Sequence, residues 1–153
     1  MTNENPVQQL LDAYTAAVYA KDIDAFMAIY DENIGVFDMW GTSWMYQGAQ
    51  SWRGVAEEWF RGLGDERIVV DIENMQVRPT AQMAFVSAFV KYTALSPEGK
   101  PLRWLQNRMT CVLEPKNGVW KITHEHTSTP ADHSSLKISL SSRTLQQKEQ
   151  PND

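Results

Sequence analysis

The chain has 153 residues and a formal net charge of −5, with 42% hydrophobic and 22% charged residues. This length fits one domain that is large enough to bury a core. An acidic chain without a basic run is a poor match for nucleic acid or an anionic membrane surface, so neither partner is expected. The single cysteine, Cys111, excludes an internal disulfide, and no basic and apolar leader pattern opens the chain. Both features favour a cytoplasmic location.

Helical periodicity predicts three helices in the first half of the chain. Asn5 and Pro6 are typical of a helix start, because Asn is a favoured N-cap and proline is tolerated in the first turn. The apolar residues that follow recur at the spacing of one helix face: Val7, Leu10, Leu11, Tyr14, Ala17 and Val18. Asp22 is expected to cap a second, shorter helix. A third helix is predicted from Ser51, with one apolar side made of Trp52, Val55, Ala56, Trp59, Phe60 and Leu63.

Extended segments account for most of the remaining chain. A short strand over 34–38 and a hairpin partner over 44–47 are predicted before the third helix. Four long strands, over 67–77, 82–95, 102–114 and 118–130, are expected after it, joined as antiparallel hairpins. Helices gathered against one antiparallel sheet define the α+β class. We expect a single domain over 1–131 and a polar, mobile C-terminal tail over 132–153.

The predicted strand over 82–95 carries apolar residues on both faces. One face holds Met83, Phe85 and Phe89, and the other holds Val86, Ala88, Val90 and Tyr92. Only one face can pack under the helices, so the other needs a cover of its own. A second subunit is the simplest cover, and the sequence therefore predicts a homodimer through the sheet.

The last predicted strand reads GVWKITHEHTSTP over 118–130. Strict alternation along a strand puts every second side chain on one face. One face is then expected to hold Trp120, Ile122, His124, His126 and Ser128, and the other Val119, Lys121, Thr123, Glu125 and Thr127. The first face begins apolar and ends in two imidazoles and a hydroxyl, which predicts a core at one end and a pocket at the other.

Three segments carry a resemblance to a known superfamily. They read LLDAYTAAVYAKDIDAFMAIYDENIGVFD over 10–38, YQGAQSW over 46–52 and RMTCVLEPKNGVWKITHEHTSTP over 108–130. The chain resembles the NTF2-like superfamily and, within it, the SnoaL-like proteins related to ketosteroid isomerase. It is also similar to the association domain of calmodulin-dependent kinase II. The resemblance covers about 7–131 and implies a cone-shaped fold, with three N-terminal helices packed on a curved, mainly antiparallel sheet around a deep pocket.

The resemblance to ketosteroid isomerases places their proton-shuttling aspartate at Asp38 and their oxyanion-binding tyrosine at Tyr14. An aspartate in an apolar pocket can take a proton from a carbon beside a carbonyl group, and a tyrosine hydroxyl can stabilise the enolate. The second, protonated acid of those enzymes has no counterpart here, because the corresponding strand offers Asn107, Arg108 and Thr110. The alternative is structural: Asp38 accepts turn amides and Tyr14 fills the core.

Arg108 is the second candidate for the pocket. A buried arginine must be paired, because an unpaired buried charge is costly. Asp38 is one candidate partner, and this pairing would depress the pKa of Asp38. A carboxylate or other anionic group of a ligand is another. The third interpretation is a salt bridge that only stabilises the fold.

Three interpretations of His124 and His126 remain open. They line the pocket as hydrogen-bonding or proton-shuttling groups, bind a metal together with Asp38, or are structural. The His-x-His spacing is too short a signal for a metal site, so no metal is expected. Trp40 and Trp44 flank a turn beside Asp38 and are expected at the pocket rim, where they could admit an aromatic or polycyclic ligand.

The remaining candidates complete a substrate-binding set. Trp104 is assigned to the pocket or to a subunit contact, and Ser128 to the pocket wall. The sequence thus predicts a SnoaL-like protein that binds a small hydrophobic, carbonyl-bearing and partly anionic compound. As an enzyme it would isomerise, cyclise or dehydrate this compound by proton transfer without a cofactor. The alternative is a non-catalytic ligand-binding or oligomerisation module that resembles the kinase association domain.

Overall fold

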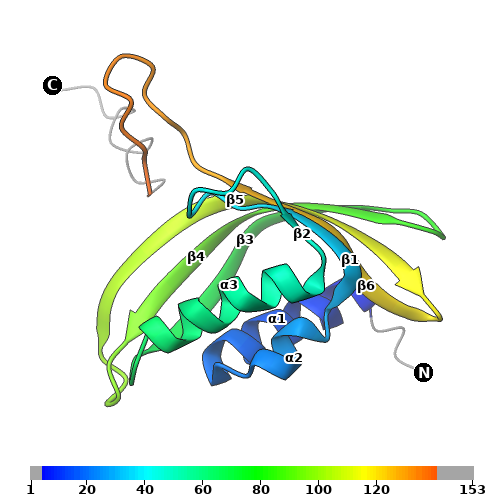
Figure 1. The fold of residues 1–153 in the computed structure, drawn as a ribbon, viewed down its shortest axis with the longest axis horizontal. Coiled ribbons are helices and arrows are strands. Elements are labelled where there is room, and N and C mark those ends of the chain that lie inside the picture. The colour runs from blue at the N-terminus through cyan, green and yellow to red at the C-terminus, as the bar shows by residue number, and fades with distance from the viewer. Residues whose placement is uncertain (1–4, 141–153) are drawn as a thin grey trace, which may run out of the picture.

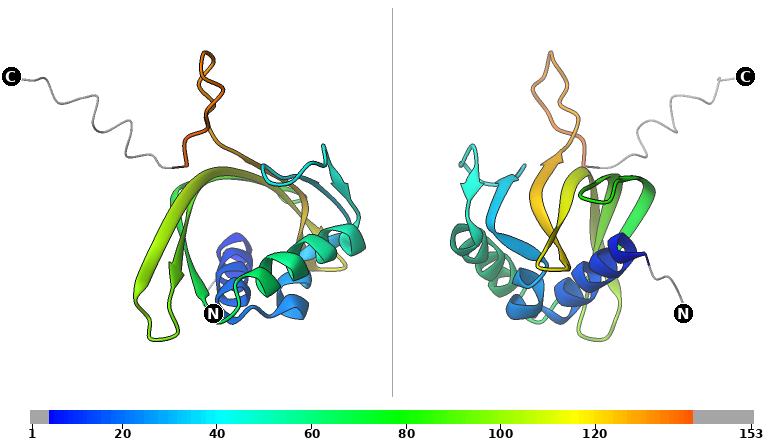
Figure 2. Two further views of the ribbon diagram at one scale, coloured as in Figure 1. Left: turned by 60° about the vertical axis from the view of Figure 1, so that its left-hand side comes forward. Right: turned by 90° about the vertical axis from the view of Figure 1, so that its right-hand side faces the viewer.

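The computed structural model describes residues 5–140 as three helices that pack on one curved sheet (Figure 1). The elements, in chain order, are α1 (Pro6–Ala20), α2 (Ile23–Met27), β1 (Tyr30–Phe37), β2 (Tyr46–Gln47), α3 (Ala49–Gly62), β3 (Arg67–Pro79), β4 (Ala84–Leu95), β5 (Pro101–Lys116) and β6 (Val119–Ser128). The helices lie on the concave side of the sheet (Figure 2). This arrangement confirms the α+β prediction. The three helices do not form one N-terminal group, however, because β1 and β2 come before α3.

The six strands are ordered β2-β1-β6-β5-β4-β3. The long strands β3 to β6 pair as antiparallel neighbours, as predicted. β1 pairs antiparallel with β2 and parallel with β6, so the sheet is mixed. The parallel pairing brings the end of β1 beside the end of β6, with Phe37 opposite His126. It joins the first and last strands of the chain and so positions the residue that follows β1, Asp38.

The first two helices begin where the sequence predicts. The side chain of Asn5 accepts a hydrogen bond from the backbone N–H of Val7 at 3.0 Å, and Asp22 accepts one from Ala25 at 3.0 Å. Such caps satisfy N–H groups that have no partner inside the helix. α1 ends at Ala20, and its C-cap, Lys21, adopts the left-handed conformation with φ 53°. All six apolar residues of the predicted α1 face are buried, which confirms that stripe.

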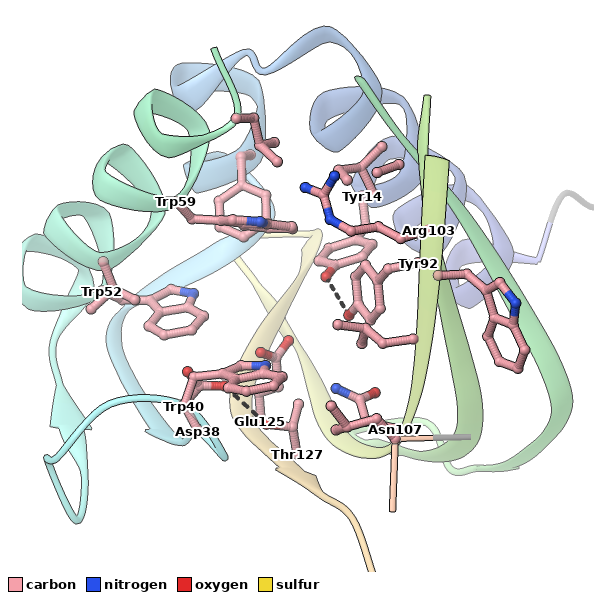
Figure 3. Close-up of a pocket in the computed structure, with 18 residues that line it drawn as sticks. Tyr14, Asp38, Trp40, Trp52, Trp59, Tyr92, Arg103, Asn107, Glu125 and Thr127 are labelled. Carbon is pink, nitrogen blue, oxygen red and sulfur yellow. Dashed lines mark hydrogen bonds between the residues drawn. The ribbon is translucent and has the colours of Figure 1, made fainter. Parts of the chain in front are cut away.

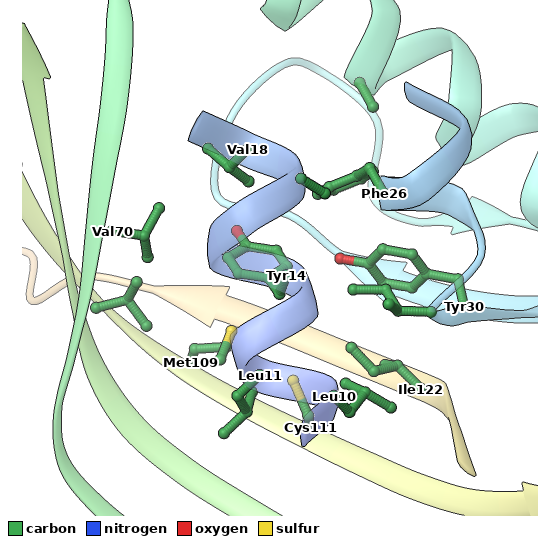
Figure 4. Close-up of a cluster of buried hydrophobic side chains, with 14 of the residues drawn as sticks. Leu10, Leu11, Tyr14, Val18, Phe26, Tyr30, Val70, Met109, Cys111 and Ile122 are labelled. Atoms are coloured by element: carbon green, nitrogen blue, oxygen red, sulfur yellow. The ribbon is translucent and has the colours of Figure 1, made fainter. Parts of the chain in front are cut away.

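Phe26 lies at the centre of an aromatic cluster between the helices and the sheet (Figure 4). Its ring centroid is 5.6 Å from that of Tyr14, 5.2 Å from Tyr30, 6.4 Å from Trp59 and 5.5 Å from Phe60. The rings meet at tilted or edge-to-face angles, which aromatic pairs favour. This cluster holds α1, α2 and α3 together and forms one wall of the space under the sheet.

A β-bulge at Thr123 changes the direction of the side chains in β6. Val112 of β5 pairs with His124 and the next residue, Leu113, pairs with Ile122, so Thr123 is the extra residue. The alternation shifts by one at this point. Ile122 is buried, and the next inward side chains are Glu125 and Thr127 rather than the histidines. The prediction that His124, His126 and Ser128 share the face of Ile122 is therefore wrong.

The chain after β6 turns back onto the sheet within residues 129–140. A bridge joins Ala131 to Ile138, and the carbonyl oxygen of Leu140 accepts a hydrogen bond from the backbone N–H of Gln106 at 2.7 Å. This is the described part of the predicted tail, and 141–153 lies outside the described residues. The domain boundary at residue 131 stays a prediction. No helix within residues 5–140 is both long and apolar enough to cross a bilayer.

Candidate functional site

A cavity of about 550 Å³ lies between the helices and the concave face of the sheet (Figure 3). Its walls are mainly aromatic: Tyr14, Phe26, Trp40, Trp52, Trp59, Tyr92 and Trp104 line it. Its polar lining consists of Asp38, Arg103, Asn107, Glu125 and Thr127. A concave, largely apolar space with a few convergent polar groups is typical of a small-molecule site.

Asp38 follows directly after β1 and faces this cavity. The hydroxyl of Thr127 donates a hydrogen bond to its Oδ1 at 2.9 Å. Burial is the largest influence on the carboxyl group and raises its pKa, because low polarity disfavours the charged form. The hydrogen bonds from Thr127 and from the backbone N–H groups of Trp40 and Met39 act in the opposite direction. Asp38 is therefore a stronger base than an aspartate in water.

Glu125 is a second carboxyl group on the cavity wall, and it is only 4% exposed. The hydroxyl of Tyr30 donates a hydrogen bond to its Oε1 at 2.9 Å. Burial raises the pKa of Glu125 to about 7, and the charge of Asp38 adds to this rise. None of the ion pairs within residues 5–140 includes Asp38 or Glu125. The cavity therefore contains two carboxyl groups without a protein counter-charge.

Two tyrosine hydroxyls meet on the other side of the cavity. The hydroxyl oxygens of Tyr14 and Tyr92 are 3.0 Å apart and form a hydrogen bond (Figure 3). Burial is the main cause that raises the pKa of both hydroxyls, so both stay protonated at neutral pH. One hydroxyl donates to the other, which leaves one hydroxyl proton free for a ligand oxygen.

Asn107 adds a buried acceptor. Its side-chain Nδ2 donates to the sulfur of Met39 at 3.4 Å, whereas its Oδ1 has no hydrogen-bond partner. Exchanging the amide oxygen and nitrogen would bring two acceptors together, so the sulfur contact favours this orientation. Asn107 is only 5% exposed. A buried polar atom without a partner is costly, and one that borders a cavity indicates a ligand group.

Arg103 lies at the edge of the cavity and is already paired. Its two terminal nitrogens donate to the two carboxylate oxygens of Glu66 at 2.9 and 2.6 Å. A bidentate pair of this kind uses the planar fork of the guanidinium group. Arg103 is the one cationic residue among the described residues that line the cavity.

Four of the sequence-predicted site residues line this cavity: Tyr14, Asp38, Trp40 and Trp104. Trp44 is 97% exposed and borders, with His126 and Asp38, a shallow hollow outside it. This hollow brings two more predicted residues near Asp38, but on the outer side of the sheet.

The other candidates also lie on the outer face of the sheet. The rings of His124 and His126 pack edge-on against Phe37, with centroids 5.0 and 5.4 Å away. Arg108 is exposed and donates from Nε to Oγ of Ser128 at 3.1 Å. The cavity-lining set includes none of these residues, and no ion pair within residues 5–140 joins Arg108 to Asp38.

The sequence did not single out five polar residues of the cavity: Tyr92, Arg103, Asn107, Glu125 and Thr127. The sequence contains a usable signal for Tyr92, because this residue shares the predicted strand face of Val86, Ala88 and Val90, which can pack under the helices. Glu125 and Thr127 had none, because only the bulge turns them inward. Within residues 5–140, no three His, Cys, Asp or Glu side chains come together as a metal-binding group.

The fold and the cavity together define an α+β protein with a curved sheet around an aromatic-walled pocket. The SnoaL-like domain model matches residues 7–132, and the chain belongs to this family. This match confirms the resemblance that the sequence segments carry.

Solved structures agree with this assignment at the level of the fold. An NTF2-like protein of unknown function from Pseudomonas putida KT2440 is 22% identical, with a TM-score of 0.76 over 88% of this chain and 91% of that one. A putative calcium/calmodulin-dependent protein kinase II association domain from Xanthomonas campestris is 20% identical (TM-score 0.67, 80% and 84% covered). An NTF2-like superfamily protein from Salmonella enterica serovar Typhimurium LT2 is 15% identical (TM-score 0.65, 84% and 92% covered). The comparison with curated proteins found no match.

Proposed function

We propose that this protein is a cofactor-independent enzyme that isomerises, cyclises or dehydrates a small hydrophobic carbonyl compound by proton transfer. One observation carries the proposal: a carboxyl group without a counter-charge, Asp38, and a tyrosine hydroxyl pair border the same aromatic-walled cavity. A base, an oxyanion donor and an apolar enclosure are the parts that carbon-proton transfer beside a carbonyl group requires.

The chemistry assigned to these residues is an exchange of one proton. The Asp38 carboxylate takes a proton from the carbon beside the carbonyl group, and the electrons of the broken C–H bond form an enolate. The free hydroxyl proton of the Tyr14–Tyr92 pair forms a hydrogen bond with the enolate oxygen. Protonated Asp38 then returns the proton to a different carbon, which completes an isomerisation. No atom or electron is gained or lost, so this step needs no cofactor.

The surroundings of Asp38 support its assignment as the base. Its raised pKa increases its affinity for a proton, while the bonds from Thr127 and two backbone amides keep the carboxylate accessible at neutral pH. General bases work best when their pKa lies near the working pH. Trp40, Trp52 and Trp59 supply flat apolar surfaces that favour an aromatic or polycyclic ring system.

A matched pair of variants tests the proposal. The probe is a β,γ-unsaturated polycyclic ketone, and the appearance of conjugated-enone absorbance measures its isomerisation. Asp38→Asn is expected to lower the rate by about a hundredfold or more, with an unchanged melting temperature. Asp65→Asn removes an exposed carboxylate and is expected to leave the rate unchanged. If Asp38→Asn alters mainly the melting temperature, the assignment of Asp38 as the base is wrong.

The second candidate function is a non-catalytic binding or assembly module. Exposed large apolar side chains include Phe37, Met83, Phe85 and Phe89, each 39–44% exposed. The β4 members of this set point away from the helices, and their exposure supports a homodimer through the outer face of the sheet. The fold shared with the Xanthomonas campestris domain agrees with this proposal. The buried free thiol of Cys111 agrees with the proposed cytoplasmic location.

A further inference from the structure

Three of the polar side chains that line the cavity present acceptor oxygens. Asp38 and Glu125 contribute carboxyl groups, and Asn107 contributes an amide oxygen without a hydrogen-bond partner. Oε1 of Glu125 already accepts a hydrogen bond from Tyr30. A ligand group that satisfies these acceptors must donate hydrogen bonds. The cavity also offers two donors, the indole Nε1 of Trp52, which is buried without a partner among the described residues, and the free hydroxyl proton of the Tyr14–Tyr92 pair, and an acceptor on the same ligand would satisfy these.

The charge of the cavity is also unbalanced. Neither carboxyl group has an ion-pair partner within the described range 5–140, and the cation at the edge, Arg103, is already held by both oxygens of Glu66. Arg108, which would have served as a clamp for an anionic ligand, lies on the outer face and contacts Ser128. A carboxylate or phosphate ligand would therefore meet the charge of Asp38, and that of Glu125 as it ionises, with no free cation among the described residues that line the cavity.

The aromatic side chains that line the cavity also favour a cationic ligand. Trp52 and Trp59 come from α3 and face, across the cavity, the strands and the loop that carry Asp38, Glu125 and Asn107 (Figure 3). Indole and phenol rings attract cations through the negative charge of their faces, and most strongly when water is excluded. An apolar ring system would be held by the same surfaces.

From these three observations we propose that the cavity selects ligands that combine an apolar ring system with a protonated amine. The ammonium group donates to a carboxylate and to Oδ1 of Asn107, and it supplies the positive charge that the cavity lacks. Two carboxyl groups leave one for the ammonium ion and one for proton transfer. The inference rests on the proposed function only in taking this cavity as the ligand site, and it requires no turnover.

The test uses three probes that share one ring system, with binding measured by isothermal titration calorimetry. They are naphthalene rings that carry an aminomethyl, a hydroxymethyl or a carboxylate group at the same position. The aminomethyl probe is expected to bind at least about tenfold tighter than the neutral alcohol, and the carboxylate is expected to bind more weakly than both. Equal binding of amine and alcohol, tighter binding of the carboxylate, or no binding of the amine overturns the inference.

Variants locate the preference within the cavity. Asp38→Asn and Glu125→Gln are each expected to reduce the ratio of amine to alcohol affinity, whereas Asp65→Asn, outside the cavity, leaves it unchanged. Melting temperatures identify any variant that fails to fold, and the three-probe comparison on the unaltered protein decides the question without them. A ratio that all the folded cavity variants retain contradicts the placement in this cavity.

The pH dependence gives an independent readout. The titratable groups that face Glu125 are Tyr14, Tyr30, Tyr92, Cys111 and Asp38. Burial raises the pKa of the three tyrosines and of Cys111, so these four stay neutral. The carboxylate form of Glu125 grows between pH 6 and pH 8, so the amine is expected to bind up to about tenfold tighter over this range. Glu125→Gln is expected to abolish this change, and its persistence in that variant contradicts the role of Glu125.

The two proposals fail in different ways. Isomerisation of a neutral ketone without a preference for the amine probe overturns the ligand inference and leaves the proposed function intact. A clear preference for the amine, with no turnover of any ketone, overturns the proposed function and leaves the ligand inference intact.

Discussion

The hydroxyl group of Thr127 donates a hydrogen bond to Oδ1 of Asp38 at 2.9 Å, although 89 positions separate the two residues. The same hydroxyl accepts a bond from the backbone N–H of Met39 at 3.0 Å. These contacts join the end of β1 to β6. Thr127 faces inward because of the bulge at Thr123. A single irregularity in one strand thus positions the proposed base.

Thr127→Val removes this hydrogen bond with little change in side-chain shape. The bond stabilises the carboxylate and lowers the pKa of Asp38, so its loss is expected to raise that pKa further. The acid limb of the rate-against-pH profile for ketone isomerisation then moves to higher pH. The cost in the free energy of unfolding should be about 1 kcal/mol. Thr127→Ser keeps the hydroxyl and is expected to retain the original profile, and a profile that stays unchanged in Thr127→Val contradicts the contact.

Glu125 is expected to make the protein less stable as the pH rises. The pKa of its carboxyl group goes from 4.5 to about 7 on folding. Between these values the folded protein keeps a proton that the unfolded chain has released. The free energy of unfolding therefore falls as the pH rises through this range, by roughly 3 kcal/mol.

Urea unfolding of the unaltered protein and of Glu125→Gln, measured from pH 4.5 to pH 8, checks this prediction. Glu125→Gln has no titrating group at this position, so its free energy of unfolding should change less with pH. Its stability relative to the unaltered protein should be highest above pH 7. Asp65→Asn is the matched control for loss of an exposed carboxyl group. Parallel curves for the unaltered protein and Glu125→Gln would show that Glu125 titrates normally.

The sequence predicted the helices and the order of the long strands well, because both depend on local patterns. The apolar stripe of α1 and the cap at Asn5 are direct examples. The parallel contact between β1 and β6 was not predicted, because it joins segments that are far apart in the sequence and no turn specifies it.

The candidate site was predicted in part. Asp38 and Tyr14 line one cavity, as the resemblance implied. Alternation assigned the wrong face to the end of β6, because no residue type there signals a bulge. Val112 and Leu113 pair on either side of Thr123, a register that depends on tertiary packing. Glu125 lines the cavity only because of this bulge, so alternation alone did not predict it as a site residue.

Phe89 tests the proposed homodimer. Its side chain is 39% exposed on the outer face, opposite Arg108 on the neighbouring strand. Phe89→Glu places a charge in the proposed interface, between Arg108 on β5 and Glu73 on β3, at an exposed position, so the monomer should fold. Light scattering after size-exclusion chromatography is expected to show a dimer for the unaltered protein and a monomer for this variant. Tyr19→Glu, at an exposed aromatic residue on α1 beside Arg67, should remain a dimer, and a monomeric unaltered protein contradicts the proposal.

A crystal structure of the protein with a bound polycyclic ketone tests the central claim most directly. Electron density is expected inside the cavity, with the carbonyl oxygen within hydrogen-bonding distance of the Tyr14–Tyr92 pair and the adjacent carbon beside the carboxylate of Asp38. Density only in the outer hollow near Trp44 and His126, or a cavity filled by its own tryptophan side chains, would contradict it.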